Sequence, residues 1–334
     1  MTAKMKRREF ITLLGSAAAA WPRAARAQQQ AGRMRRIGIL MPYAEGDTEY
    51  GARVLALRQE LARLGWAEGA NVQFDERWTT NNMDRVRANA ESLMASNPDV
   101  VVATGGRVVP VLMRLSRSVP IVVPTSIDPV GIGWVESLAR PGGNVTGFTV
   151  LELSMFGKTL EILKQIAPAT TRVGLIYNPD NPNSVVFRRA IEPFASRLAV
   201  APVDLPIHEL GDIKRALAHL ADRPNAAVFF LPDITTNAMR ADVIPLVGQH
   251  RLPAIYSEPM FVKSGGLAYY GADRLDLYRR AASYVDRILR GEKPGELPFQ
   301  QPTKYQLLLN LNAAKGLGLE LSPTLLALAD EVIE

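Results

Sequence analysis

The 334-residue chain contains no cysteine. It therefore cannot form a disulfide, a thiolate metal site or a cysteine nucleophile, and it offers no cysteine for a lipid anchor. It has only three histidines, His208, His219 and His250, which lie far apart in the sequence. We interpret each as a solvated surface residue, and we expect neither a metal site nor a histidine-based catalytic centre.

The motifs of the common enzyme classes are also missing. No GxGxxG follows the first predicted strand, and no GxxxxGK[ST] loop, GxSxG elbow or HExxH pair occurs. We therefore expect no catalytic residues and no cofactor. No segment, including the apolar run at residues 10–21, reaches the length of a membrane-spanning helix.

Residues 1–27 have the pattern of an export signal. Lys6, Arg7 and Arg8 precede the alanine-rich run, and residues 25–27 (ARA) have the small-x-small form that signal peptidase cleaves. The paired arginines resemble a twin-arginine signal, although the Sec route stays open. Because the run is too short to anchor the chain, we expect an exported, soluble, unlipidated protein in the periplasm.

The export signal also accounts for most of the net charge, which is formally +6 for the whole chain. Six of the 39 basic residues and one of the 33 acidic residues lie in residues 1–27, so the rest carries 33 basic and 32 acidic residues. This near balance provides no electrostatic footprint for DNA or RNA. We expect no nucleic-acid partner.

From residue 36 onward, short apolar runs alternate with amphipathic stretches, which is typical of an α/β fold with parallel sheets. The length suggests roughly two domains. The first predicted strands are 37–41, 72–78, 100–104 and 121–123, and the first predicted helices are 50–64, 83–95 and 107–115.

The second half of the chain repeats the first. Residues 36–40 (RIGIL) are matched by 172–176 (RVGLI), and 98–102 (PDVVV) by 224–228 (PNAAV). Three further matches follow in the same order, pairing 119–122 with 252–255, 126–129 with 257–259, and 142–143 with 265–266. Five ordered matches predict two similar doubly wound lobes with parallel sheets.

A long amphipathic helix at 276–290 follows the second lobe, and we expect it to return to the first. The proline-rich stretch 294–302 would then cross back, leaving a final helix at 323–332 on the second lobe. Three such connections form a hinge. We assign 1–27 to the export signal, 34–148 plus 274–298 to the N-terminal lobe, and 149–273 plus 299–334 to the C-terminal lobe.

Several stretches resemble the ABC-transporter substrate-binding protein family of the type I periplasmic binding protein fold, the group that includes tryptophan- and tyrosine-type receptors. The matching stretches are 64–66 (LGW), 68–72 (EGANV), 128–131 (DPVG), 137–147 (SLARPGGNVTG), 177–179 (YNP), 252–256 (LPAIY) and 301–304 (QPTK). The resemblance covers nearly the whole chain after the signal. It implies a solute receptor that works with a membrane ABC permease, and it does not name the solute.

In open α/β sheets, ligands bind beyond the carboxyl ends of the strands, and in a two-lobed molecule those ends face one cleft. The first lobe contributes the candidates Tyr43, Thr104, Gly105, Gly106, Thr125, Ser126 and Asp128. The second lobe contributes Tyr177, Asn178, Asp233, Thr235, Tyr256 and Glu258. Hydroxyls, glycines, acids and tyrosines form a binding composition rather than a hydrolytic one.

The candidate residues predict a zwitterion of the amino-acid type. Gly105 and Gly106 would place amides at a helix N-terminus, which favours a carboxylate, and Thr104 would add a hydroxyl donor. Asp233 or Glu258, once buried, would need a cation such as an ammonium group.

The tyrosines Tyr43, Tyr177 and Tyr256 could cover an apolar or aromatic body. Structural roles are the alternative for some of these residues: a tight turn for the two glycines, a helix cap for Asp233 and a core position for Tyr177.

The sequence therefore indicates a monomeric periplasmic receptor for a small solute, and it contains none of the enzyme motifs named above. Two alternatives stay open, a ligand-binding module that serves a membrane sensor and an exported α/β enzyme that uses a carboxylate.

We expect the mature protein to begin at Gln28, because cleavage follows the small-x-small pattern. N-terminal sequencing of protein recovered from the periplasm checks this. Changing Arg7 and Arg8 to Lys blocks export only if the twin-arginine route is used. Protein retained in the cytoplasm and still beginning before Lys6 would contradict export.

Overall fold

The computed structural model describes residues 33–334 except 81, 151, 153 and 182. The predictions for the export signal at 1–27 and for cleavage before Gln28 lie outside these residues. Among the described helices, none combines the length and the apolar character that crossing a membrane requires.

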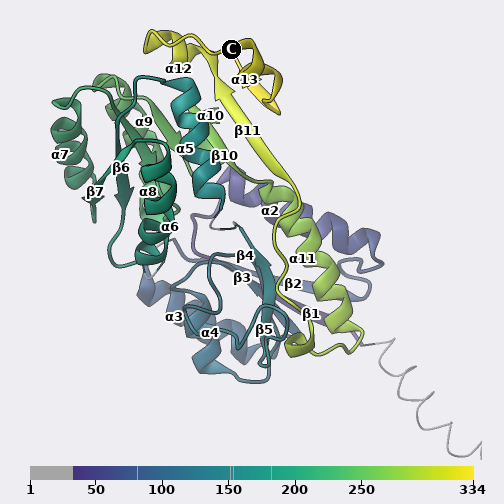
Figure 1. Ribbon diagram of the computed structural model, residues 1–334. Helices are drawn as coiled ribbons and strands as arrows, with labels where there is room; N and C mark the ends of the chain where they lie inside the picture. Colours follow the sequence, from purple (N-terminus) through teal and green to yellow (C-terminus); the bar gives the residue numbers. More distant parts are fainter. Residues whose placement is uncertain (1–32, 81, 151, 153, 182) are drawn as a thin grey trace, which may run out of the picture.

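The first sheet has five parallel strands in the order β2-β1-β3-β4-β5 (Figure 1). Helices connect the first four strands along the chain, and a loop connects β4 to β5. Its elements are β1 (Arg35–Met41), α2 (Thr48–Arg63), β2 (Val72–Trp78), α3 (Met83–Ala95), β3 (Val100–Ala103), α4 (Val109–Leu115), β4 (Ile121–Ser126) and β5 (Val145–Thr149). We call this sheet and its helices the first lobe.

The second sheet has seven strands in the order β12-β11-β10-β9-β8-β6-β7. Its elements, which we call the second lobe, include α5 (Met155–Ile166), β6 (Arg172–Tyr177), α6 (Ser184–Arg197), β7 (Ala201–Pro206), α7 (Leu210–Ala221), β8 (Ala226–Phe230), α8 (Ile234–Ala238), α9 (Arg240–Gln249), β9 (Ala254–Tyr256), α10 (Pro259–Lys263) and β10 (Ala268–Ala272). It is completed by β11 (Tyr305–Asn310), α12 (Leu311–Gly316), α13 (Pro323–Ala327) and β12 (Glu331–Ile333).

The internal repeat of the sequence is a repeat of topology. The order β2-β1-β3-β4-β5 in the first sheet corresponds strand by strand to β7-β6-β8-β9-β10 in the second. This confirms the predicted fold of two similar doubly wound lobes. One departure is the antiparallel pairing of β11 with β10, which extends the second sheet beyond the repeat.

Strands β3 and β8 lie inside their sheets, and their side chains are apolar on both faces. Every residue of β3 and β8 is buried, as expected for parallel strands covered by helices on both sides. Helix α2 begins after Asp47, whose carboxylate accepts hydrogen bonds from the backbone amides of Glu49 and Tyr50. This cap satisfies two of the free backbone amides at the start of α2.

Helix α11 (Arg274–Leu289) follows the second lobe in sequence but packs on the first, beside α2 (Figure 1). The indole of Trp66 donates to the carboxylate of Asp286 at 2.8 Å, and the hydroxyl of Thr146 donates to the carbonyl of Leu297 at 2.7 Å. The chain therefore crosses between lobes after β5, after β10 and before β11. These crossings form the three-segment hinge, while the exact lobe boundaries stay predictions.

The predicted final helix at 323–332 is wrong. Helix α13 ends at Ala327, and residues from Glu331 to Ile333 form β12, which pairs with β11. The carboxylate of Asp330 accepts a hydrogen bond from the amide of Leu307 and directs the chain onto the sheet edge. The segment forms a strand because β11 offers it a free sheet edge to pair with. The periodicity of the segment's own residues does not reveal that edge.

Candidate functional site

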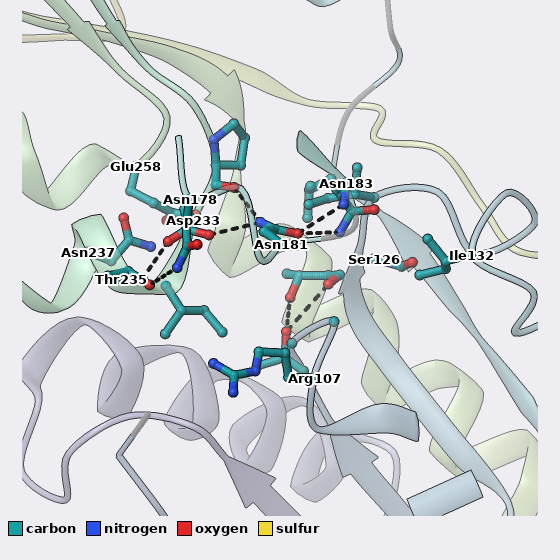
Figure 2. A pocket seen from close by; sticks show the side chains of 18 of the residues that line it. Arg107, Ser126, Ile132, Asn178, Asn181, Asn183, Asp233, Thr235, Asn237 and Glu258 are labelled. Carbon is teal, nitrogen blue, oxygen red and sulfur yellow. Dashed lines mark hydrogen bonds between the residues drawn. The ribbon is translucent and has the colours of Figure 1, made fainter. Parts of the chain in front are cut away.

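A cavity lies between the lobes at the carboxyl ends of both sheets (Figure 2). Its walls are formed by residues that follow β1, β3 and β4 in the first lobe and β6, β8 and β9 in the second. Ten sequence-predicted residues line it: Tyr43, Thr104, Gly105, Gly106, Thr125, Ser126, Asn178, Asp233, Thr235 and Glu258. The structure thus confirms that the strand ends of the two lobes converge on one cleft.

Three predicted residues do not line the cavity. Tyr256 is 1 % exposed and stacks between Phe230 and Phe261, so it belongs to the core. Tyr177 is the last residue of β6, and its ring also lies in a core cluster, whereas the next residue, Asn178, reaches the cavity. Because successive strand residues point to opposite faces, only one of two neighbours can do so.

Asp128 is the third of these. Its carboxylate accepts a hydrogen bond from the amide of Gly131 at 2.8 Å and closes a turn in the loop after β4. A local turn therefore uses the side chain that the sequence suggested for a ligand.

The cavity also contains residues that the sequence analysis missed. Those with polar or charged side chains are Arg107, Asp180, Asn181, Asn183, Asn237 and Arg274, and those with apolar side chains are Ile127, Ile132, Trp134, Val150 and Ile234. They lie one to eight residues beyond a strand end. The asparagine-rich loop after β6 is a signal that could have identified part of this set.

Hydroxyl groups form the first-lobe wall. The side chains of Thr104 and Thr125 are hydrogen-bonded to each other. Ser126 is 2 % exposed, and its hydroxyl has no hydrogen-bond partner among the described residues. A buried hydroxyl of this kind can donate to an acceptor on a solute.

Gly105 lies where the first lobe packs closely against Ile234 of the second. Its φ is +101°, which favours glycine, and a Cβ atom there would lie 3.3 Å from the side chain of Ile234 in the second lobe. Helix α4 begins only at Val109, after a turn in which Val108 donates to the Gly105 carbonyl. The expectation that the glycines lie directly at a helix N-terminus is therefore wrong, because a turn separates them from the helix.

Asp233 provides a buried carboxylate on the second-lobe wall. It caps α8, accepting from the amide of Thr235 at 2.7 Å, and it also accepts from the side-chain amide of Asn181 at 2.9 Å. It is 8 % exposed, and no Lys or Arg among the described residues pairs with it. Burial raises the pKa of Asp233 above its ordinary value.

Glu258 has a different environment. Its two carboxylate oxygens pair with Arg53 of α2 at 2.7 Å and with Arg274 of α11 at 2.9 Å, and all three side chains are buried. Burial alone would raise the pKa of Glu258, but Arg274 and Arg53 lower it below its ordinary value. The hypothesis that Glu258 needs a cation from the solute is wrong, because the protein supplies two.

Two asparagines add acceptors to the second-lobe wall. The side-chain oxygens of Asn183 and Asn237 are buried without a hydrogen-bond partner among the described residues. Figure 2 shows Asn181 between Asp233 and Asn183, with Ser126 and Arg107 on the facing side. The second lobe therefore presents acceptors, and the first presents hydroxyls and a guanidinium group.

Most of the apolar side chains in the cavity come from the first lobe, and Ile234 comes from the second. Tyr43 stacks on Tyr50, while Ile132 and Trp134 come from the loop after β4. Within residues 33–334, apart from the four undescribed positions, no group of three or more His, Asp or Glu side chains could hold a metal ion. The arrangement has the chemistry of a site for a small organic molecule.

Solved structures with the same architecture define the class of protein. A conserved domain protein from Vibrio cholerae O1 biovar eltor str. N16961 aligns with a TM-score of 0.83 and 26 % identity, covering 90 % of this chain and 100 % of that one. A Streptococcus pneumoniae ABC domain in complex with L-Trp gives 0.83 at 21 % identity, with the same coverage. The fold is that of type I periplasmic binding proteins.

The family follows from the sequence match. The model for ABC transporter substrate-binding proteins matches residues 40–333, so the chain belongs to that family. A curated relative, the tyrosine-binding protein of Clostridioides difficile (strain R20291), is 25 % identical over 264 residues, which are 78 % of this chain and 74 % of that protein. The family and fold are those of solute-binding proteins rather than enzymes.

Replacing Glu258 with Gln is expected to lower the free energy of unfolding by about 3–5 kcal/mol, because two buried arginines lose their counter-charge. Since the folded-state pKa of Glu258 is lowered, the parent has this contribution at neutral pH and loses it as the pH falls through that pKa. Denaturant unfolding of the parent and the variant at several pH values measures both the loss of stability and its dependence on pH.

The matched control is Glu292→Gln, which removes an exposed carboxylate from its ion pair with Arg287. We expect it to change stability far less than Glu258→Gln does, because solvent screens an exposed ion pair. Equal, small losses in both variants would contradict a structural role for Glu258.

Proposed function

We propose that this protein is the periplasmic receptor of an ABC importer, and that it captures an amino-acid-like solute and delivers it to a membrane permease. Membership of the substrate-binding family supports the transport role, and the export pattern at residues 1–27 supports the location. The relatives that bind tyrosine or L-Trp favour amino acids as the solute class.

The observation that carries the solute class is the uncompensated carboxylate of Asp233. A buried carboxylate is costly unless a cation pairs with it. An ammonium group has three donors, and this wall provides Asp233 together with the free side-chain oxygen of Asn237. The solute's ammonium group therefore binds the second lobe.

The solute's carboxylate binds the first lobe. The hydroxyl of Ser126 and one hydroxyl of the Thr104–Thr125 pair donate to it, and Arg107 adds positive charge at the exposed side of the cavity. The apolar side chains of Ile132 and Trp134 cover the solute's body. A solute that contacts both lobes binds the closed form better than the open one, which couples binding to closure.

Titration calorimetry with L-tyrosine and L-tryptophan tests this assignment. Two analogues of tyrosine separate its charged groups: tyramine lacks the carboxylate, and 3-(4-hydroxyphenyl)propanoate lacks the ammonium group. We expect the propanoate to bind at least about 30-fold more weakly, because the desolvated carboxylate of Asp233 loses its partner. Tyramine should also bind more weakly, because the buried hydroxyl of Ser126 loses its acceptor. Equal binding of the parent amino acid and the propanoate would exclude an ammonium site.

Asp233→Asn is expected to weaken the amino acid about 30-fold or more. Asn still caps α8, and it removes the cost of a buried charge. Because the pKa of Asp233 is raised, that carboxylate lowers stability as the pH rises through its titration. At neutral pH the unliganded variant should therefore melt at or above the parent temperature.

The pH dependence gives a second readout. Protonation of Asp233 weakens the parent's binding on the acid side, and this loss is absent in Asp233→Asn. The matched control is Asp180→Asn, an exposed carboxylate at the same cavity, which we expect to change affinity less than threefold. Parent-like affinity in Asp233→Asn would overturn the ammonium assignment.

A further inference from the structure

The N-terminal turns of α2 make a row of polar contacts with the second lobe. Asp47 pairs with Arg240 at 3.0 Å, Glu49 pairs with Lys263 at 2.8 Å and Arg53 pairs with Glu258 at 2.7 Å. In addition, the side-chain amide of Asn237 donates to the hydroxyl of Tyr50 at 3.3 Å. We call these four contacts the α2 seam.

The seam residues share one face of the helix. The positions at 47, 50 and 53 recur every three residues, and 49 and 53 are four apart, so their side chains lie above one another. Their partners come from two separate parts of the second lobe, namely α8 with the start of α9, and α10 with its N-cap residue Glu258. The contacts therefore depend on how the second lobe as a whole is placed against α2, and not on the conformation of one local turn.

None of these contacts needs a solute atom. Asp47, Glu49, Arg240 and Lys263 lie outside the cavity lining, and the two ion pairs that they form are complete within the protein. Opening the hinge would separate these oppositely charged groups. The seam therefore favours the closed form whether or not a solute is bound.

Asn237 connects the seam to the cavity. Its amide nitrogen bonds to Tyr50 across the lobes, while its free side-chain oxygen belongs to a residue that lines the cavity. Glu258 has a similar position, because it lines the cavity and pairs with Arg53. A solute on the second-lobe wall thus lies next to the residues that hold α2.

We propose that the α2 seam is an electrostatic latch, which keeps a fraction of the receptor closed in the absence of solute and thereby sets its apparent affinity. The affinity effect rests on the proposed function, whereas the solute-free population does not. The apparent affinity for a solute is proportional to the fraction of protein already in the conformation that binds it. A receptor that is partly closed without solute therefore spends less of the binding free energy on closing.

The test removes the two outer pairs from the second-lobe side, as Arg240→Gln with Lys263→Gln. Asp47 and Glu49 are kept, because Asp47 caps α2 and both stabilise its N-terminus. The matched control, Arg87→Gln with Arg188→Gln, changes charge equally but breaks ion pairs within one lobe each.

The absence of native cysteine allows site-specific labelling of an introduced pair. Glu91→Cys on α3 and Lys214→Cys on α7 are exposed positions in different lobes. Spin labels at these positions report the interlobe distance in solute-free protein at about 0.05 M salt, where surface charges are weakly screened.

The parent is expected to show a closed population without solute. The latch variant should lower the closed-to-open ratio about two- to tenfold, as should raising the salt to about 1 M in the parent, while the control stays parent-like. The affinity for L-tyrosine should weaken by no more than the same factor. The charge swap Glu49→Lys with Lys263→Glu should restore closure relative to Lys263→Glu alone.

A parent without a closed population, or a latch variant indistinguishable from the control, overturns the latch. If the latch variant opens the molecule but neither tyrosine nor tryptophan binds the parent, the latch is supported and the proposed solute class fails. Solute-free distances therefore separate the two proposals.

Discussion

The buried pairing of Glu258 with Arg53 and Arg274 is the interaction on which the rest of the site depends. It joins α2 of the first lobe, the end of β9 in the second lobe and the start of α11, where the chain crosses between them. Because all three side chains are buried, none can lose its partner without a large cost. The pairing also determines which cavity charges remain for a solute.

That division of charge explains the different roles of two acidic residues. Glu258 and Asp233 both line the cavity and both follow a strand of the same sheet. The first has two guanidinium partners, and the second has only amide donors. Similar placement therefore produces a structural carboxylate in one case and a candidate ligand-binding carboxylate in the other.

The same contacts relate binding to lobe movement. The N-terminal turns of α2 contact the second lobe in two ways. The partly exposed Asp47 and Glu49 form ion pairs, and the buried Tyr50 and Arg53 form a hydrogen bond and a buried ion pair. Residues that line the cavity, Glu258 and Asn237, take part in the buried half of these contacts. Solute capture and closure therefore share side chains, which gives the hinge a direct physical connection to the cavity.

The amino-acid sequence by itself determined the α/β class, the duplicated lobes and the strand ends at which the cavity lies, because apolar periodicity and repeated segments are readable along the chain. It could not separate Tyr177 from Asn178, since a shift of one residue moves a strand side chain to the other face. It also could not show that Glu258 is neutralised. Arg53 lies 205 positions away in the chain, and only the tertiary structure brings that charge within hydrogen-bonding distance.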